Sequence, residues 1–460
     1  MSKPTHIKLA FYGDDFTGST DALEFLTRAG ARTVLFLRNP DSEMMARFGD
    51  IDAIGVAGMT RSMAPDEMAQ VLSEAFESLK KLDTDHVHYK VCSTFDSSPE
   101  IGNIGTAIDI GQKVFDNPFT PILVAAPNLG RYSAFGNLFA RMGIGSEGAI
   151  YRLDEHPSMS KHPTTPALDG DLRDHLAKQV NMKMGLIDLT DLVKSDEAIL
   201  EKIENLKSEG TEVVFFDAMY EDQMQLIGSV LHQLAPKPLF SVGSSGIEKA
   251  LGDFWGAKKE LSPRSDWQAV KEEPTILVLS GSASPVTADQ IEEAESLGWE
   301  SVGLEVDALK DPERYQVGYV GRIINALIEQ KSVIFHTCKG PNDKRIAETE
   351  DYFTSLGLSS LEMRKETARQ FGGFLGKIAR EVLSKVEVNR LVIAGGDTSS
   401  YAARALGIDA VEMIARIVTG APLCRAYAEG SPADGLQINL KGGQVGDRNY
   451  FEALRKGRLN

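Results

Sequence analysis

Short apolar runs alternate with amphipathic segments through the first half of the chain. Apolar residues recur with helical spacing over 65–81 and 101–114, and Pro65 stands where the first of these helices would begin. Strands are predicted at residues 7–12, 32–37, 53–57, 87–91, 121–126, 183–188, 211–217 and 239–242. Because strands that alternate with helices form parallel βαβ units, the pattern predicts an α/β fold with a mainly parallel sheet.

Two stretches interrupt this alternation. Residues 130–170 lack clear periodicity and are rich in Gly, Ser, His and Pro, which predicts a long loop. Residues 256–274 are charged, contain two prolines and have no apolar face. We therefore place a linker at 259–273 between two domains, 1–258 and 274–460. We expect both domains to be α/β, with mainly parallel sheets and a cleft between the domains.

The second domain resumes the alternation and ends in a more β-like segment. Its predicted strands are residues 275–279, 332–335, 390–394 and 436–440, and its long helices are 312–330 and 361–385. We find no internal repeat and no segment of low complexity.

Composition and charge exclude several classes of function. The net charge of the 460-residue chain is -17, which argues against nucleic acid or an anionic membrane as the main partner. The three cysteines are far apart and lack CxxC spacing, so neither a disulfide framework nor a zinc site is expected. The N-terminus lacks the apolar core of a signal peptide, and no apolar run is long enough to span a membrane. We expect a cytoplasmic protein in a reducing compartment.

The end of the first predicted strand carries two adjacent acids, Asp14 and Asp15. The strand stops at Gly13, and a helix is predicted to begin at Ser19 or Thr20. Ligands of open α/β sheets bind at such strand-to-helix turns. Paired carboxylates there favour chemistry on a hydroxyl or a metal, and the alternative is that they only cap the helix.

Three cations also lie near predicted strand ends. Arg61, Lys90 and Arg131 could bind the carboxylate of an acidic substrate, and the alternative for each is a solvated surface cation. Cys92 follows a strand as well. No His stands beside it at a known spacing, so a small buried residue is the favoured interpretation over a nucleophile.

Three Gly-rich turns follow predicted strands of the second domain, at 280–284, 394–400 and 441–446. Glycines allow backbone amides to approach phosphates, and a following helix N-terminus favours negative charge. Each turn alone is common in α/β proteins, but three in one domain favour a phosphate or nucleotide site. None matches the Walker or GxGxxG patterns. Haloacid-dehalogenase-type phosphatases have Asp-x-Asp after their first strand, whereas here Phe16 stands two positions after Asp14, and GxSxG and HExxH are absent.

These motifs together resemble the four-carbon acid sugar kinase family. The resemblance rests on DDFTGSTDALE at 14–24, YKVCST at 89–94, PNLGR at 127–131, SGSAS at 280–284, AGGDTSS at 394–400 and LKGGQVG at 440–446. It implies an N-terminal sugar-acid domain, a C-terminal nucleotide domain, and phosphorylation of a short sugar acid by ATP with Mg²⁺. A non-catalytic nucleotide-binding sensor of a sugar acid is the alternative, and a homodimer is compatible with either.

The resemblance also implies roles for single residues. Asp15 would accept the hydroxyl proton and Asp14 would orient the hydroxyl or hold Mg²⁺ through water, with Asp397 as the competing base. The expected substrate-binding residues are Arg61, Lys90, Ser93 and Arg131. The expected nucleotide-binding residues are Ser282, Ser284, Gly395, Gly396, Asp397, Thr398, Gly442 and Gly443.

Two positions depart from the family pattern. Members often have Lys-x-Asp-Ser-Thr followed shortly by Arg-Gly, whereas this chain has Cys92 at the Asp position and Asp96-Ser97 in place of Arg-Gly. Asp397 also stands where Glu is usual. The first change removes a cation from the substrate side. It favours a related branched or oxidised acid, such as 3-oxo-isoapionate, over plain threonate or erythronate.

Overall fold

A computed structural model describes residues 6–142, 148–162, 164–234 and 236–458. The chain divides into two compact units, one of residues 1–34 and 38–265 and the other of residues 35–37 and 266–460. Residues 258–276 lie between α8 (Gly246–Ala257) and β12 (Leu277–Ser280) and form neither helix nor strand. No helix in the described ranges is long and apolar enough to cross a membrane.

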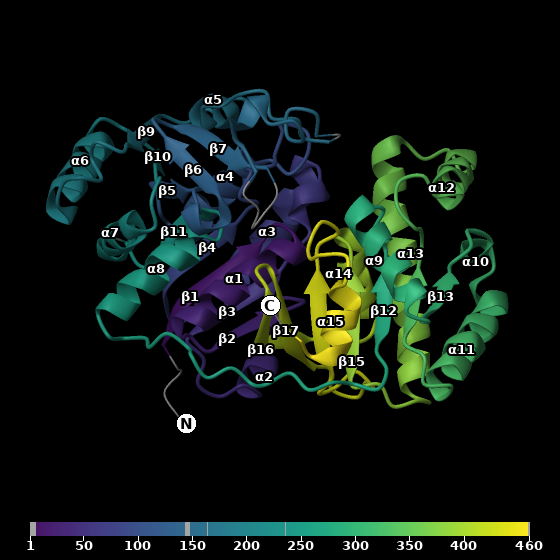
Figure 1. The fold of residues 1–460 in the computed structure, drawn as a ribbon. Helices are drawn as coiled ribbons and strands as arrows, with labels where there is room; N and C mark the ends of the chain where they lie inside the picture. The colour runs from purple at the N-terminus through teal and green to yellow at the C-terminus, as the bar shows by residue number, and fades with distance from the viewer. Residues whose placement is uncertain (1–5, 143–147, 163, 235, 459–460) are drawn as a thin grey trace. The chain divides into compact units, whose positions relative to one another are not determined.

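The first unit, purple to teal in Figure 1, contains a parallel sheet in the order β3-β1-β4-β11-β5-β10-β9. These strands are β1 (Ile7–Gly13), β3 (Ala53–Ala57), β4 (Thr84–Lys90), β5 (Thr120–Leu123), β9 (Met184–Ile187), β10 (Val213–Phe216) and β11 (Leu239–Gly243). β1 is buried along almost its whole length, as expected for a parallel strand covered on both faces. The predicted α/β fold with mainly parallel strands is confirmed.

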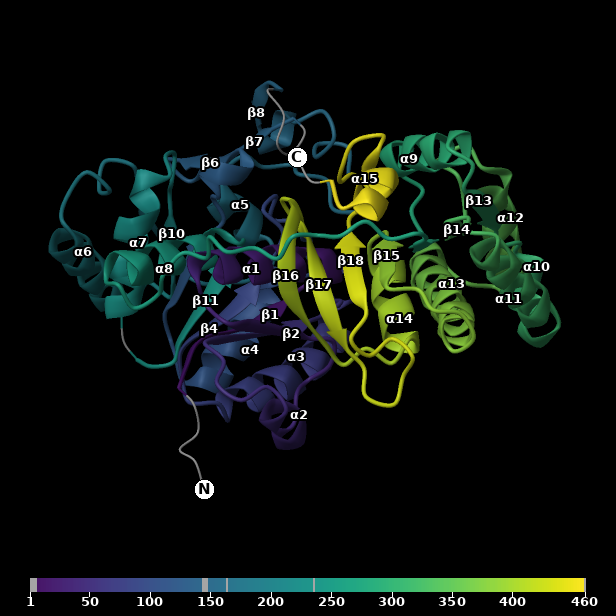
Figure 2. The ribbon, with the colours of Figure 1, turned by 60° about the horizontal axis from the view of Figure 1, so that its bottom comes forward.

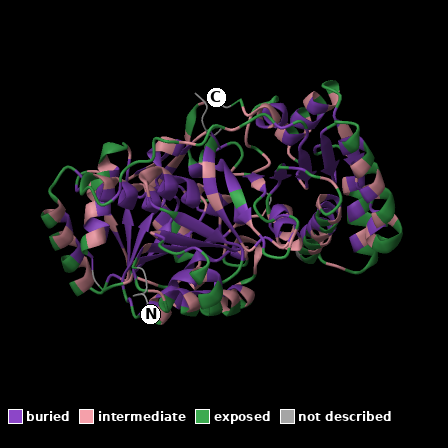
Figure 3. Ribbon diagram, turned by 90° about the horizontal axis from the view of Figure 1, so that it is seen from below, coloured by how far each residue is buried: buried purple, intermediate pink, exposed green. Residues whose placement is uncertain are grey.

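Helices on both sides complete this unit. They are α1 (Phe16–Ala29), α2 (Ser42–Ala46), α3 (Pro65–Lys80), α4 (Ile104–Phe115), α5 (Leu172–Ala177), α6 (Asp196–Ser208), α7 (Asp222–Gln233) and α8. Aromatic rings of Tyr12, Phe76, Tyr89, Phe115 and Phe240 pack on one another in the core. Figure 3 shows the strands buried and the outer helix faces exposed.

Two predictions about this unit were wrong. Helix α1 begins at Phe16 rather than at Ser19 or Thr20, because Asp15 has extended backbone angles and caps the helix by accepting a hydrogen bond from Gly18 N (2.9 Å). Part of the predicted loop at 130–170 forms the antiparallel strands β6 (Arg131–Ala134), β7 (Asn137–Arg141) and β8 (Ile150–Arg152). Such short strands leave little periodicity to detect.

The second unit, green to yellow in Figure 1, combines parallel and antiparallel strands. β13 (Glu300–Gly303), β14 (Val333–His336), β12, β15 (Arg390–Ala394) and β18 (Gln437–Lys441) are parallel neighbours in that order. The sheet continues antiparallel through β17 (Ala421–Tyr427), which lies beside β18, and then β16 (Ala410–Val418), which lies beside β17 in Figure 2. Leu35 and Phe36 of β2 (Thr33–Phe36) pair with β16, so this short segment belongs to the second unit.

Two helices of the second unit, α9 (Pro285–Ser296) and α14 (Asp397–Ala405), start directly after Gly-rich strand ends. The others are α10 (Asp307–Lys310), α11 (Pro312–Ile328), α12 (Lys344–Ser355), α13 (Ser360–Leu383) and α15 (Tyr450–Lys456). Because β12, β15 and β18 are adjacent and parallel, their carboxyl ends lie together at one edge. The sequence placed a Gly-rich turn at each of these three ends.

Candidate active site

Asp14, Asp15 and Arg61 form a compact ionic cluster in the first unit. Arg61 Nε donates to Asp14 Oδ2 (3.0 Å), and Arg61 Nη2 donates to Asp14 Oδ1 (2.8 Å). The same Nη2 also donates to Asp15 Oδ1 (2.8 Å). Asp14 is buried and uses both carboxylate oxygens on this one guanidinium. Arg61 is thus occupied by two carboxylates, which fits a positioning role better than the predicted contact with a substrate acid.

The parallel sheet brings this cluster together. Asp14 N donates to Lys90 O at the end of β4 (2.8 Å), and Gly58 N after β3 donates to Gly13 O (2.9 Å). Arg61 lies in a short 3₁₀ turn, η1 (Thr60–Ser62), and its backbone N–H donates to Asp14 O (3.0 Å). Three neighbouring strand ends therefore hold the cluster through backbone hydrogen bonds.

Asp15 differs from Asp14 in its freedom to bind a ligand. Its Oδ1 accepts from Gly18 N and from Arg61, and its side chain is 13% exposed. In the described part of the chain, its Oδ2 has no hydrogen-bond partner. The cap and the catalytic interpretation are therefore compatible, because one oxygen caps α1 while the other can accept a hydroxyl proton.

Lys90 adds a second cation at the first turn of α1. It is buried, and its Nζ lies 4.0 Å from Asp21 Oδ2. A side chain at residue 18 would meet Lys90 Nζ at 2.5 Å and Asp15 Oδ1 at 2.4 Å, so a larger residue there forces these two side chains to move. Gly18 thereby brings the ammonium close to the carboxylate of Asp15.

Burial dominates the electrostatics of this site. Desolvation raises the pKa of Asp14 although Arg61 opposes it, and it raises the pKa of Asp21 to about 6 although Lys90 opposes it. Desolvation works against the charge of Lys90, but Asp21, Asp15 and Asp14 outweigh it and raise the Lys90 pKa. The ammonium therefore stays charged at neutral pH, as a binder of an anionic substrate requires.

The remaining predicted substrate residues lie in neighbouring segments. Arg131 is buried, and its Nη1 donates to the carbonyls of Leu129, Gly130 and Arg141 (3.2–3.3 Å). Its Nε is buried without a hydrogen-bond partner in the part of the chain that the structure describes. Ser93 is half-buried in the segment after β4. Arg131 thus retains one buried donor that no described group of the protein uses.

Cys92 does not have the properties of a nucleophile. It is half-buried, and burial followed by the charge of Asp96 raises its pKa to about 11. A thiolate is therefore disfavoured at neutral pH. Cys92 Sγ instead lies 3.0 Å from Thr94 Oγ1, which donates to Asp96 Oδ1 (2.7 Å).

The three Gly-rich turns of the second unit do come together. Gly281 N donates to Ala394 O (2.9 Å), and Gly395 N donates to Lys441 O (3.0 Å). A side chain at residue 281 would meet Thr398 Cγ2 at 2.2 Å, and one at 443 would meet Ser282 Oγ at 2.5 Å. These close approaches bring the three Gly-rich turns together at one edge of the sheet, where such turns and the helix N-termini beside them favour an anionic ligand.

The other predicted nucleotide residues line the same turns. Ser284 caps α9, and its Oγ accepts from Val286 N (3.2 Å). Gly395 has φ +139°, a conformation that other residues avoid, and Gly396 is the exposed N-cap of α14. Asp397 is half-buried in the first turn of that helix, and Gly442 is half-buried after β18.

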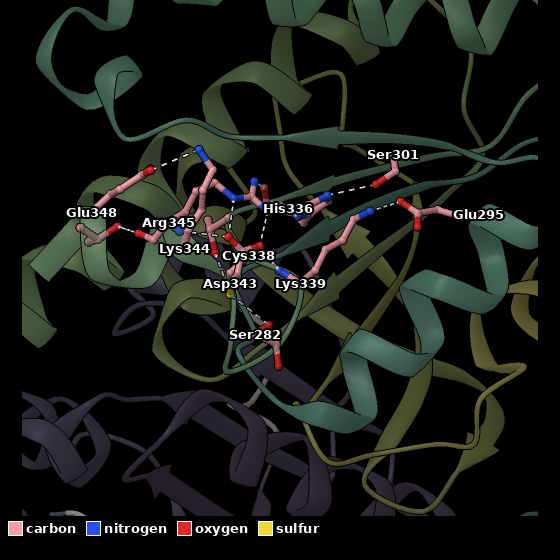
Figure 4. A network of polar contacts seen from close by, with 12 residues as sticks. Ser282, Glu295, Ser301, His336, Cys338, Lys339, Asp343, Lys344, Arg345 and Glu348 are labelled. Carbon is pink, nitrogen blue, oxygen red and sulfur yellow. Dashed lines mark hydrogen bonds and ion pairs between the residues drawn. The ribbon is translucent and has the colours of Figure 1, made fainter.

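The end of β14 supports the 280–284 turn. Cys338 Sγ donates weakly to Ser282 O (3.5 Å), as Figure 4 shows. Arg345 donates to His336 Nδ1 (3.2 Å) and pairs with Asp343, while His336 Nε2 lies 3.0 Å from Ser301 Oγ. Burial, and next the charge of Arg345, lowers the His336 pKa to about 3, so this imidazole is neutral.

Three residues of these sites were missed from the sequence. Gly18 and Asp21 stand inside the quoted DDFTGSTDALE motif, and Lys441 directly precedes the Gly442-Gly443 pair. Lys441 is buried, and its Nζ donates to Thr287 Oγ1 in the first turn of α9 (3.2 Å). The sequence signal that could have identified Lys441 is a lysine followed by two glycines at a predicted strand end.

Comparisons with known proteins cover the same two regions. The family model described as sugar-binding N-terminal domain matches residues 9–251, and that described as nucleotide-binding C-terminal domain matches 277–451. The chain is 40% identical to the 3-oxo-isoapionate kinase of Paraburkholderia graminis, over 99% of this chain and 96% of that protein. It is 31% identical to the 3-oxo-tetronate kinase of Pseudomonas savastanoi pv. phaseolicola, over 97% and 96% of the two chains.

Solved structures agree on the fold. A Salmonella typhimurium LT2 protein titled a tRNA synthase aligns with TM-score 0.76 at 24% identity, over 98% of this chain and all of that one (100%). A Haemophilus influenzae protein aligns with TM-score 0.70 at 23% identity, over 97% and 99% of the two chains. At these identities the likeness concerns the fold alone.

Proposed function

Because the chain belongs to the four-carbon acid sugar kinase family, we propose that it transfers the γ-phosphoryl group of ATP to a hydroxyl of a small sugar acid. The observation that carries this proposal is the hydrogen bonding of the two Asp15 carboxylate oxygens. One carboxylate oxygen is anchored by Gly18 N and Arg61, and the other has no partner within the described ranges. A fixed carboxylate with one unused oxygen suits the orientation of an attacking hydroxyl.

Other residues of the first unit position Asp15 or bind the substrate. Arg61 and Asp14 position Asp15, since Asp14 is buried and both of its oxygens are occupied. Lys90 and Arg131 bind the substrate carboxylate, and Ser93 lies in the segment that follows Lys90. Placing two cations against an anionic substrate orients it and partly neutralises its charge near the incoming phosphate.

In the second unit, ATP is bound by the turns that contain Ser282, Gly395–Thr398 and Gly443, with the N-termini of α9 and α14 facing its phosphates. Mg²⁺ supplies charge neutralisation on the phosphates. In the described ranges no group of three or more His, Cys, Asp or Glu residues could hold a metal by itself. We therefore assign Mg²⁺ to the nucleotide complex, with the Asp397 carboxylate in the first turn of α14 as a candidate ligand.

The substrate proposed first is 3-oxo-isoapionate, and 3-oxo-tetronate is second, in the order of similarity to the two named kinases. The test is ADP release by the full chain over a panel that adds threonate and erythronate, with the phosphorylated product identified by mass spectrometry. ADP release with one of these acids supports the kinase. ATP binding without turnover of any acid would favour a sensor instead.

The assignment of the base is tested by two matched variants. Asp15→Asn should lower kcat by about 10²–10⁴-fold with little change in KM, while Asp397→Asn should act mainly on KM for ATP. Asp66→Asn, at an exposed position in the first turn of α3, controls for the loss of one charge. Near-normal kcat in Asp15→Asn would transfer the role to Asp397.

A further inference from the structure

Lys441 is a buried lysine at the strand end that leads into the 441–446 turn. It ends β18 with a relative exposure of 1%. Its Nζ donates to Thr287 Oγ1 (3.2 Å), and Thr287 Oγ1 donates to Gly443 O (2.8 Å). The rings of Tyr450 and Phe451 lie 5.7 and 5.9 Å from the same ammonium. The amine therefore lies against both the first turn of α9 and the 441–446 turn.

This position is costly for a cation unless an anion is present. In the described ranges, no carboxylate lies within ion-pair distance of Lys441 Nζ, and the first turn of α9 carries no acidic residue. The N-terminus of a helix repels positive charge, and a buried ammonium without a counterion loses its hydration. A methionine would fill this space without either penalty, so packing alone does not explain a lysine.

We propose that Lys441 supplies the buried positive charge of the nucleotide site and that the polyphosphate of ATP is its missing counterion. The inference rests on the proposed function. The turns at 280–284, 394–398 and 441–446 contact one another through Gly281, Gly395 and Gly443, and Gly395 N donates to the backbone carbonyl of Lys441 itself (3.0 Å). A charge at low dielectric acts over several ångströms without direct contact, so Lys441 strengthens the hold of backbone N–H groups on the phosphates.

The protonation of Lys441 should then be coupled to nucleotide binding. Burial alone lowers its pKa to about 7, with no charged group contributing. The groups packed around it are the hydroxyl of Thr287 on α9 and the rings of Tyr450 and Phe451 on α15. Tyr450 is the titratable member, and its hydroxyl donates to Asn439 Oδ1 (3.0 Å). A bound polyanion raises the pKa of the amine, so the protein takes up a proton when ATP binds above pH 7.

The experiment is isothermal titration calorimetry of the full chain with Mg²⁺ and a non-hydrolysable ATP analogue, without sugar acid. Binding is measured at pH 8 in buffers with different ionisation enthalpies, because this comparison counts the protons taken up. Lys441→Met is compared with Lys385→Met, which removes the same charge from a side chain that is 51% exposed and paired with Glu381. Thermal melts establish that each variant is folded.

We expect wild type to take up protons when it binds the analogue. Lys441→Met should bind the analogue at least about tenfold more weakly and without proton uptake, because it loses a charge-assisted interaction. Lys385→Met should match wild type. A folded Lys441→Met with wild-type affinity overturns the inference, as does wild-type binding without proton uptake, which needs no variant. No binding of the analogue by wild type would instead refute the proposed kinase function.

Discussion

Arg61 offers the sharpest test of how the first unit is built. The substitution Arg61→Met keeps a long apolar stem but removes the partner of both Asp14 oxygens and one partner of Asp15. Asp14 has a relative exposure of 2%, and methionine offers its two oxygens no hydrogen-bond donor. The variant must either keep an unpaired buried carboxylate or protonate it.

The magnitude follows from these two options. Removing one partner of a buried ion pair costs about 3–5 kcal/mol of the free energy of unfolding. Burial already raises the pKa of Asp14, and loss of Arg61 raises it further. The native variant then holds a proton that the unfolded chain has released, so its stability falls as pH rises, by up to about 1.4 kcal/mol per pH unit. The defect should therefore be larger at pH 8 than at pH 5.

The assay is urea unfolding followed by circular dichroism at both pH values. Asp14→Asn combined with Arg61→Met should recover much of the loss, because an amide carries no charge to bury. Arg38→Met, at a side chain that is 57% exposed, should change stability by less than about 0.5 kcal/mol. An Arg61→Met protein with wild-type stability at both pH values, or a double variant no better than the single one, would refute the reasoning.

Three further predictions concern the other named residues. Arg131→Leu removes the buried Nε donor and should raise KM for the sugar acid by about tenfold or more while leaving KM for ATP unchanged, as steady-state kinetics can resolve. Gly18→Ala forces its methyl group against Lys90 Nζ and Asp15 Oδ1, so kcat should fall by about tenfold or more. The control Gly49→Ala has open space around it and should retain kcat, although the left-handed backbone at residue 49 costs some stability. Without ATP, the free energy of unfolding of Lys441→Met should exceed that of wild type by up to about 5 kcal/mol at pH 6.5, because burial lowers the pKa of Lys441 from 10.5 to about 7. This difference in stability should become smaller toward pH 9, and a difference that urea unfolding finds constant with pH would contradict the prediction.

Much of the fold could be predicted because strands that are buried on both faces consist mainly of apolar residues. Parallel strands such as β1 and β15 consist mainly of apolar residues, and their ends are marked by Gly and polar residues. The strands β6 to β8 were missed, since each is very short and pairs through backbone groups that any residue supplies. β16 was not located individually, because it alternates buried with partly exposed positions and so carries a weaker apolar signal, and β17 was not located either, although most of its residues are buried.

Some features of the candidate site could likewise be predicted from the sequence, and others could not. The sequence alone determined that Asp14 and Asp15 follow a buried strand and that three Gly-rich turns end strands of one domain, because local periodicity and turn chemistry mark strand ends. Only the tertiary structure decided that Arg61, 47 residues away, occupies both oxygens of Asp14 and leaves Asp15 one oxygen for a substrate. It also decided that Lys441 is buried without a carboxylate partner. Such pairings depend on which strands become neighbours, and on the low dielectric around them, which no local pattern of residues records.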